Sequence, residues 1–220
     1  MRRTIQVATL AAAALAAYGQ APPDRDGNQT GVVWGPPKVE LFEAQPRPTV
    51  PKEMIGGLSI AGWPIVLEDT ELIATRKHFG GTLGSRGDAG EALAWLCLYR
   101  RDKGASWVLW LESFEIDGPT IGGFRWQQLD NNSKMDERCQ PLRGNDSSLN
   151  LPLALCLGMK EADVVATLGQ PSKRSGNTVI YVHEHDLTIR SEPYTVSNDV
   201  IITYRAGRIW AVEVTHSTVS

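Results

Sequence analysis

Two neighbouring strand-like runs, residues 92–100 and 106–116, are apolar on both of their faces. Side chains alternate between the two faces of a strand, so one face of this pair carries Trp95, Tyr99 and Trp110 while the other carries mainly leucines. An apolar sheet face must be covered, either by the rest of the chain or by a partner. The pair therefore predicts a sheet that is covered on both sides, or one that presents an aromatic face to another molecule.

The connection between these runs predicts a hairpin, because residues 101–104 are polar and end in glycine. A loop of this length pairs Leu96 with Leu109 and Trp95 with Trp110. Two interpretations of the aromatic face remain open, namely burial against the other half of the chain and exposure to a partner protein. For the second interpretation, the predicted partner-binding residues are Trp95, Tyr99, Trp110 and Trp126.

The order of a helix, a glycine stop and several strands occurs twice along the chain. Capping residues and a following glycine predict helices at 71–79 and at about 160–168. The predicted strands cover residues 92–100, 106–116, 120–129, 178–185, 200–204 and 208–216. We therefore predict an α+β fold of two tandem modules, 54–135 and 136–220. Each module is expected to place a short helical segment on an antiparallel sheet of three or four strands.

The N-terminal residues predict export from the cytoplasm. Residues 1–21 combine two early arginines, an alanine-rich apolar run and small residues, which is the order of a secretory signal peptide. Residues 22–53 contain seven of the 13 prolines and are expected to form an extended or disordered leader. No later run is apolar and long enough to span a membrane, so the expected location is periplasmic or secreted.

Three cysteines in an oxidising compartment predict one disulfide and one remaining thiol. We expect Cys139 to pair with Cys156, because both lie in the irregular stretch that joins the two halves and a bridge there closes a short loop. Cys97 lies between two leucines and is expected to be a small buried hydrophobic residue.

Charge and motifs argue against several functional classes. The net charge is −3 and the basic residues are scattered, so no nucleic-acid partner is expected. The sequence contains no G-x-S-x-G or H-E-x-x-H motif and no phosphate-binding loop, and we expect neither an enzyme nor a cofactor. His183 and His185 lie on one face of a predicted strand and form the only candidate metal pair, but no motif places a third ligand.

Residues 158–171 read GMKEADVVATLGQP and resemble the signature of the SmpA/OmlA family of envelope lipoproteins. The tandem layout is similar to that of the β-lactamase inhibitory protein. The resemblance implies a fold and a mode of action, which is the binding of other proteins through a sheet face, and it implies no particular target. The chain lacks the cysteine that follows the signal in the lipoproteins, so no lipid anchor is expected.

From these features we expect an exported, non-catalytic protein-binding module that acts as an inhibitor or accessory factor. An alternative is a structural component of envelope assembly, which the family resemblance suggests. A third alternative is a metal-binding module that uses His183 and His185.

Overall fold

The computed structural model describes most of the chain beyond the expected signal. The residues that it describes are 32–37, 55–87, 92–101, 106–114, 119–130, 132–142, 148–189 and 191–219. The predicted signal peptide, 1–21, lies outside the described residues, and so does most of the predicted leader, 22–53. Among the described residues, no helix combines the length and the apolar character needed to cross a membrane.

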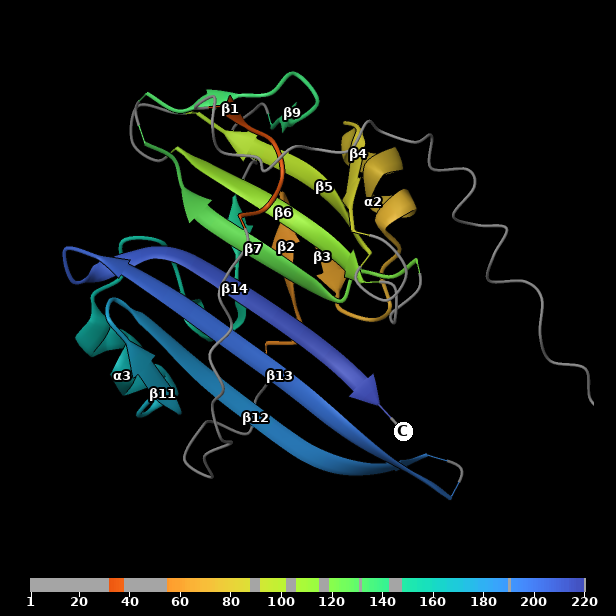
Figure 1. The fold of residues 1–220 in the computed structure, drawn as a ribbon, viewed down its shortest axis with the longest axis vertical. Helices are drawn as coiled ribbons and strands as arrows, with labels where there is room; N and C mark the ends of the chain where they lie inside the picture. Colours follow the sequence, from red (N-terminus) through yellow and green to blue (C-terminus); the bar gives the residue numbers. More distant parts are fainter. Residues whose placement is uncertain are drawn as a thin grey trace, which may run out of the picture.

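One large sheet dominates the molecule (Figure 1). Its strand order is β11-β12-β13-β14-β7-β6-β5-β4, and every neighbouring pair in this order is antiparallel. A short additional strand, β9, runs parallel to β5. The strands are β4 (Leu83–Arg86), β5 (Leu93–Arg100), β6 (Trp107–Phe114), β7 (Gly123–Gln128), β9 (Gln140–Pro141), β11 (Lys173–Ser175), β12 (Thr178–Ile189), β13 (Glu192–Arg205) and β14 (Arg208–Val219).

The predicted α+β fold of two helix-on-sheet modules is wrong, because the described chain is mostly β and has only two short helices. The two predicted sheets are joined where β7 pairs with β14, from Gly123 opposite Thr215 to Gln127 opposite Ala211. A strand at the edge of a separate sheet leaves a row of backbone N–H and C=O groups unpaired. Pairing β7 with β14 satisfies these groups and makes one sheet of the two halves.

The two helices are nevertheless close to their predicted positions. Helix α2 spans Leu72–Phe79 and helix α3 spans Glu161–Leu168. Each is followed by a glycine with positive φ, 84° at Gly80 and 78° at Gly169, a conformation that other residues adopt only with strain. Helix α2 precedes β4 to β7 and the short strand β9, helix α3 precedes β11 to β14, and the two halves meet at the β7–β14 pair.

The main hydrophobic core lies on the face of the large sheet against which α2 and α3 pack, and we call this the helix-side face. A small sheet of order β10-β2-β3 also contributes to it, with β2 (Gly57–Ile60), β3 (Trp63–Val66) and β10 (Leu149–Asn150). Burial of each large apolar side chain contributes about 1.5–3 kcal/mol relative to exposure. Fully or almost fully buried members of this core include Leu72, Leu96, Leu111, Phe124, Val164, Tyr181 and Val212.

The β5–β6 hairpin has the predicted faces but a different register. Leu96 lies opposite Leu111 and Cys97 lies opposite Trp110, whereas the predicted loop paired Leu96 with Leu109. The difference arises because the paired strands end at Arg100 and begin at Trp107, so the connection is longer than predicted. A shift of two residues keeps every side chain on its face, which is why the assignment of the faces is correct.

Candidate functional site

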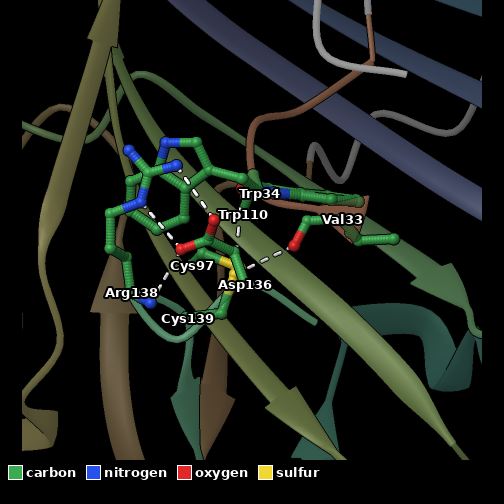
Figure 2. Close-up of polar contacts among 7 residues, drawn as sticks. All are labelled: Val33, Trp34, Cys97, Trp110, Asp136, Arg138 and Cys139. Atoms are coloured by element: carbon green, nitrogen blue, oxygen red, sulfur yellow. Dashed lines mark hydrogen bonds and ion pairs between the residues drawn. A yellow bond between two sulfur atoms is a disulfide. The ribbon is translucent and has the colours of Figure 1, made fainter. Parts of the chain in front are cut away.

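The aromatic face of the sheet is covered by a segment from the predicted leader. We call residues 32–37 the strap, and the face beneath it the strap-side face. Trp95 and Trp110 on this face are each 1% exposed, and the indole of Trp34 in the strap meets Trp95 edge to face with ring centroids 5.7 Å apart. Trp110 Nε1 donates a hydrogen bond to the carbonyl of Trp34 at 2.8 Å (Figure 2). The described part of the leader is therefore docked.

A second set of contacts holds the strap from its outer side. Strand β1 (Val32–Val33) pairs in parallel with β8 (Lys134–Met135), and the backbone N–H of Asp136 donates to the carbonyl of Val33 at 3.0 Å. The guanidinium of Arg138 lies 4.3 Å from the ring centroid of Trp34, and Asp136 fixes this guanidinium with a contact of 2.7 Å (Figure 2). Trp34 is thus held between the sheet and a cation, an arrangement that stabilises an aromatic ring.

The disulfide joins the same region to the sheet. Cys97 on β5 bonds Cys139, which directly precedes β9, and the two Cα atoms are 4.7 Å apart. The predicted Cys139–Cys156 pair is therefore wrong, and Cys156 is a free, exposed cysteine. The physical reason is the parallel pairing of β9 with β5, which brings Cys139 beside Cys97 although 42 positions separate them in sequence.

The four predicted partner-binding residues do not form one exposed surface. Trp95 and Trp110 lie beneath the strap, and Tyr99 packs at the margin of the same cluster. Trp126 is 5% exposed and lies on the opposite, helix-side face, where it meets Trp107 edge to face. The three tryptophans therefore belong to the buried clusters of the fold.

A row of charged side chains crosses the strap-side face near the centre of the sheet. Arg125 on β7 contacts Glu213 on β14, with 2.6 Å between Nη1 and Oε2. Glu112 on β6 is buried, and this burial raises its pKa to about 8. The negative charge of Glu213 adds to the effect, while Arg125 and Arg86 oppose it. Burial also raises the pKa of Glu213, against the stabilising charge of Arg125. Glu112 is therefore mostly protonated at neutral pH.

The other end of the sheet has an open edge. Strand β11 pairs only with Thr178–Ile180 at the start of β12, and the side-chain oxygen of Ser172 accepts the N–H of Val182 at 3.0 Å. Beyond Val182, no strand of the described chain pairs with the outer side of β12. We call residues 183–189 the β12 edge. In Figure 1, β12 forms the lower border of the sheet and reaches past the end of β11.

Backbone groups along the β12 edge point outward at every second residue. In an antiparallel pair, alternate residues bond the neighbouring strand and the residues between them face away. The N–H of Val182 faces away, because Ser172 receives it. The N–H and C=O groups of Glu184, Asp186 and Thr188 therefore face outward as well, and these three residues are exposed.

The strands behind the β12 edge hold it in place. Strand β13 pairs with β12 on one side and with β14 on the other, as far as Thr195 opposite Val219. The buried side chain of Asn198 donates to the carbonyls of Ile55 and Thr215 at 3.3 and 3.2 Å. Thr218 donates to Glu68 at 2.8 Å. The edge is thus a preformed strand on a supported sheet.

His183 and His185 share one face of this edge, as their spacing predicts; it is the helix-side face, and their ring centroids are 5.7 Å apart. No group of three His, Cys, Asp or Glu residues that could hold a metal ion occurs within the described ranges. Protein zinc sites use three or four such ligands, so the pair alone is an incomplete site.

Sequence reasoning placed a strand at 178–185 but missed the length of the β12–β13 hairpin. The polar run His183–Asp186 and the segment around Asn198 have low strand propensity, which favours loops over strands. One signal was present, since Thr, Val, Ile and Tyr recur on both sides of these polar residues. Pairing with β14 overrides the local propensity.

Comparison of this chain with protein-family models, with curated proteins and with solved structures yields no match in any of the three.

Proposed function

We propose that this chain is an exported, non-catalytic protein-binding protein that takes up an extended segment of a partner along the β12 edge. The observation that carries the proposal is the outward row of N–H and C=O groups at Glu184, Asp186 and Thr188, to which no described strand is paired. Addition of a strand to an open sheet edge is a common way in which proteins bind extended segments.

The energetics suit such a partner. Each backbone hydrogen bond formed with a partner strand contributes about 0.5–1.5 kcal/mol net. The contributions add to a useful affinity only if the edge is already ordered, because otherwise ordering the protein would oppose binding. Asn198 and the β13–β14 pairing supply that order before the partner arrives.

The aromatic face is a weaker candidate for the contact surface. Its tryptophans are buried beneath the strap, so a partner would have to displace Trp34 together with its hydrogen bond and cation contact. The Cys97–Cys139 disulfide and the signal-like N-terminal residues support action outside the cytoplasm, where disulfides persist.

The proposal is tested by blocking the edge without disturbing the sheet. Asp186→Pro removes an outward N–H and places the proline ring on the edge, where proline is tolerated because no ladder bond is lost. A peptide library of random strand-length sequences is selected for binding to the full mature chain. Selected peptides should bind wild type, should keep measurable binding to the Asp186→Asn control, which retains the backbone N–H, and should lose binding to Asp186→Pro.

Hydrogen exchange then locates the contact. A selected peptide should slow exchange at the backbone amides of Glu184, Asp186 and Thr188, which face outward in the free protein. Selected peptides that bind the folded Asp186→Pro variant as well as wild type, or a selection that enriches no peptide, would contradict the proposal.

A further inference from the structure

We infer that the β12 edge is selective for a cationic, extended segment of a different protein, with lysine or arginine at alternate positions, and that it disfavours a second copy of this chain. This inference rests on the proposed function. It concerns the side chains beside the outward backbone groups, since these decide which strand can be added.

The acidic side chains of the edge gather on one face of the sheet. Residues directly opposite each other in a ladder share a face, and the ladder runs from Trp110 through Arg125, Glu213 and Ile201 to Ile180. The even-numbered residues of β12 therefore lie on the strap-side face. Along the β12 edge these include Glu184 and Asp186, both exposed.

Asp199 adds a third carboxylate behind this pair. It lies on β13 directly opposite Val182, one step along the same face from Glu184, which lies opposite Ser197. Burial raises the pKa of Asp199, and the negative charge of Glu184 raises it further. Asp199 Oδ1 is buried and has no hydrogen-bond partner among the described residues. A cation placed beside Glu184 would therefore relieve repulsion that exists in the free protein.

The same charges argue against pairing with a second copy. Two β12 edges that pair antiparallel about His185 place Glu184 of one copy opposite Asp186 of the other, on both sides of the two-fold axis. Like charges directly opposite each other destabilise a strand pair. Acidic residues on an open edge therefore act in two ways, by preventing self-association and by attracting a strand of opposite charge.

The side chains on the helix-side face of the β12 edge determine which residues of the partner fit between its cationic residues. His183, His185 and Leu187 lie there, and Leu187 is 42% exposed. An apolar residue in the partner strand can cover Leu187, while the cations on either side of that residue lie on the acidic face. The matching segment thus alternates cationic and apolar side chains.

The experiment measures binding of three fluorescein-labelled peptides to the full mature chain by fluorescence anisotropy at about 0.1 M salt, where exposed charges still interact over about 10 Å. The peptides alternate valine with lysine, with threonine or with glutamate. The protein forms are wild type, Glu184→Gln/Asp186→Asn, Asp186→Pro, and a control that removes two exposed acids elsewhere, Glu137→Gln/Asp163→Asn.

The expected result is that the lysine peptide binds wild type and the control equally, and binds the Glu184→Gln/Asp186→Asn variant about tenfold more weakly. Binding to Asp186→Pro should be lost. If all three peptides bind alike and all are lost with Asp186→Pro, the charge selectivity is overturned and edge binding stands. If no peptide binds wild type, or Asp186→Pro binds unchanged, both ideas are overturned. Wild-type dimers that Asp186→Pro abolishes in light scattering would overturn the exclusion of a second copy.

Discussion

Replacement of Glu112 by glutamine should stabilise the protein, by an amount that grows with pH. Glu112 has a pKa of about 8 in the folded chain against 4.5 for the ordinary side chain. The folded protein therefore retains a proton that the unfolded chain releases. Between these two pKa values, the free energy of unfolding falls as pH rises, by about 1.4 kcal/mol per pH unit.

The size of this stability change follows from the difference between the two pKa values of Glu112. At pH 7, the wild-type protein has lost about 3 kcal/mol relative to its stability below the lower pKa. Glutamine has the shape of the protonated side chain and does not titrate, so Glu112→Gln should avoid this loss. Since the pKa is raised mainly by burial, the variant should keep the packing of this site while removing the cost of charging it.

The assay is urea unfolding followed by tryptophan fluorescence, for wild type and Glu112→Gln, at several values between about pH 5 and pH 8. The comparison of the two proteins at each pH cancels the titration of groups that do not interact with Glu112. We expect nearly equal unfolding free energies at the acidic end and an advantage of about 3 kcal/mol or more for the variant at the basic end. A difference that does not change with pH would refute the reasoning, and so would a variant that is less stable at pH 8.

Three further predictions concern the disulfide, the strap and the β12 edge. Replacing Cys97 and Cys139 together by alanine should lower the unfolding free energy by about 4 kcal/mol in the same denaturation assay, as expected for a loop of 42 residues. Replacing the free Cys156 by serine should change this free energy little. Trp34→Ala should cost about 3 kcal/mol in the same assay, because its ring is buried against the sheet, and a loss below about 1 kcal/mol would mean that the strap is not docked in solution. Asp186→Pro should leave the melting temperature nearly unchanged, whereas His185→Pro should lower the unfolding free energy by at least about 2 kcal/mol, because the N–H of His185 bonds β13. Equal effects of the two substitutions would contradict the assignment of the outward N–H groups to the even-numbered residues of the β12 edge.

The local elements were predictable because their causes are local. Helix α3 begins and ends close to its predicted limits, since a glycine with positive φ is required after Leu168. The faces of the β5–β6 hairpin were also predictable, because side chains alternate whatever the exact register. The register itself was wrong by two residues, since it depends on a loop length that propensity does not specify.

The candidate site was much less accessible from the sequence. The tryptophans were recognised as important, but their burial depends on Trp34, which lies more than 60 positions earlier in the chain than Trp95. The predicted strand 178–185 ended inside the β12 edge, which extends to residue 189. The residues of the strap and of the β12 edge carry no sequence pattern that indicates which segments lie next to them in the fold.

The amino-acid sequence by itself determined the two helices, the positions of the six longest strands, the two-sided apolar character of the central hairpin and the presence of one disulfide, because these follow from alternation, capping and composition. Only the tertiary structure decided that β7 pairs with β14, that Cys97 bonds Cys139, that the strap covers Trp95 and Trp110, and that no described strand pairs with the β12 edge. Each of these depends on which strands meet across long sequence separations. Backbone hydrogen bonds between strands are the same for every sequence, so the choice among possible partners is made by the packing of the whole sheet.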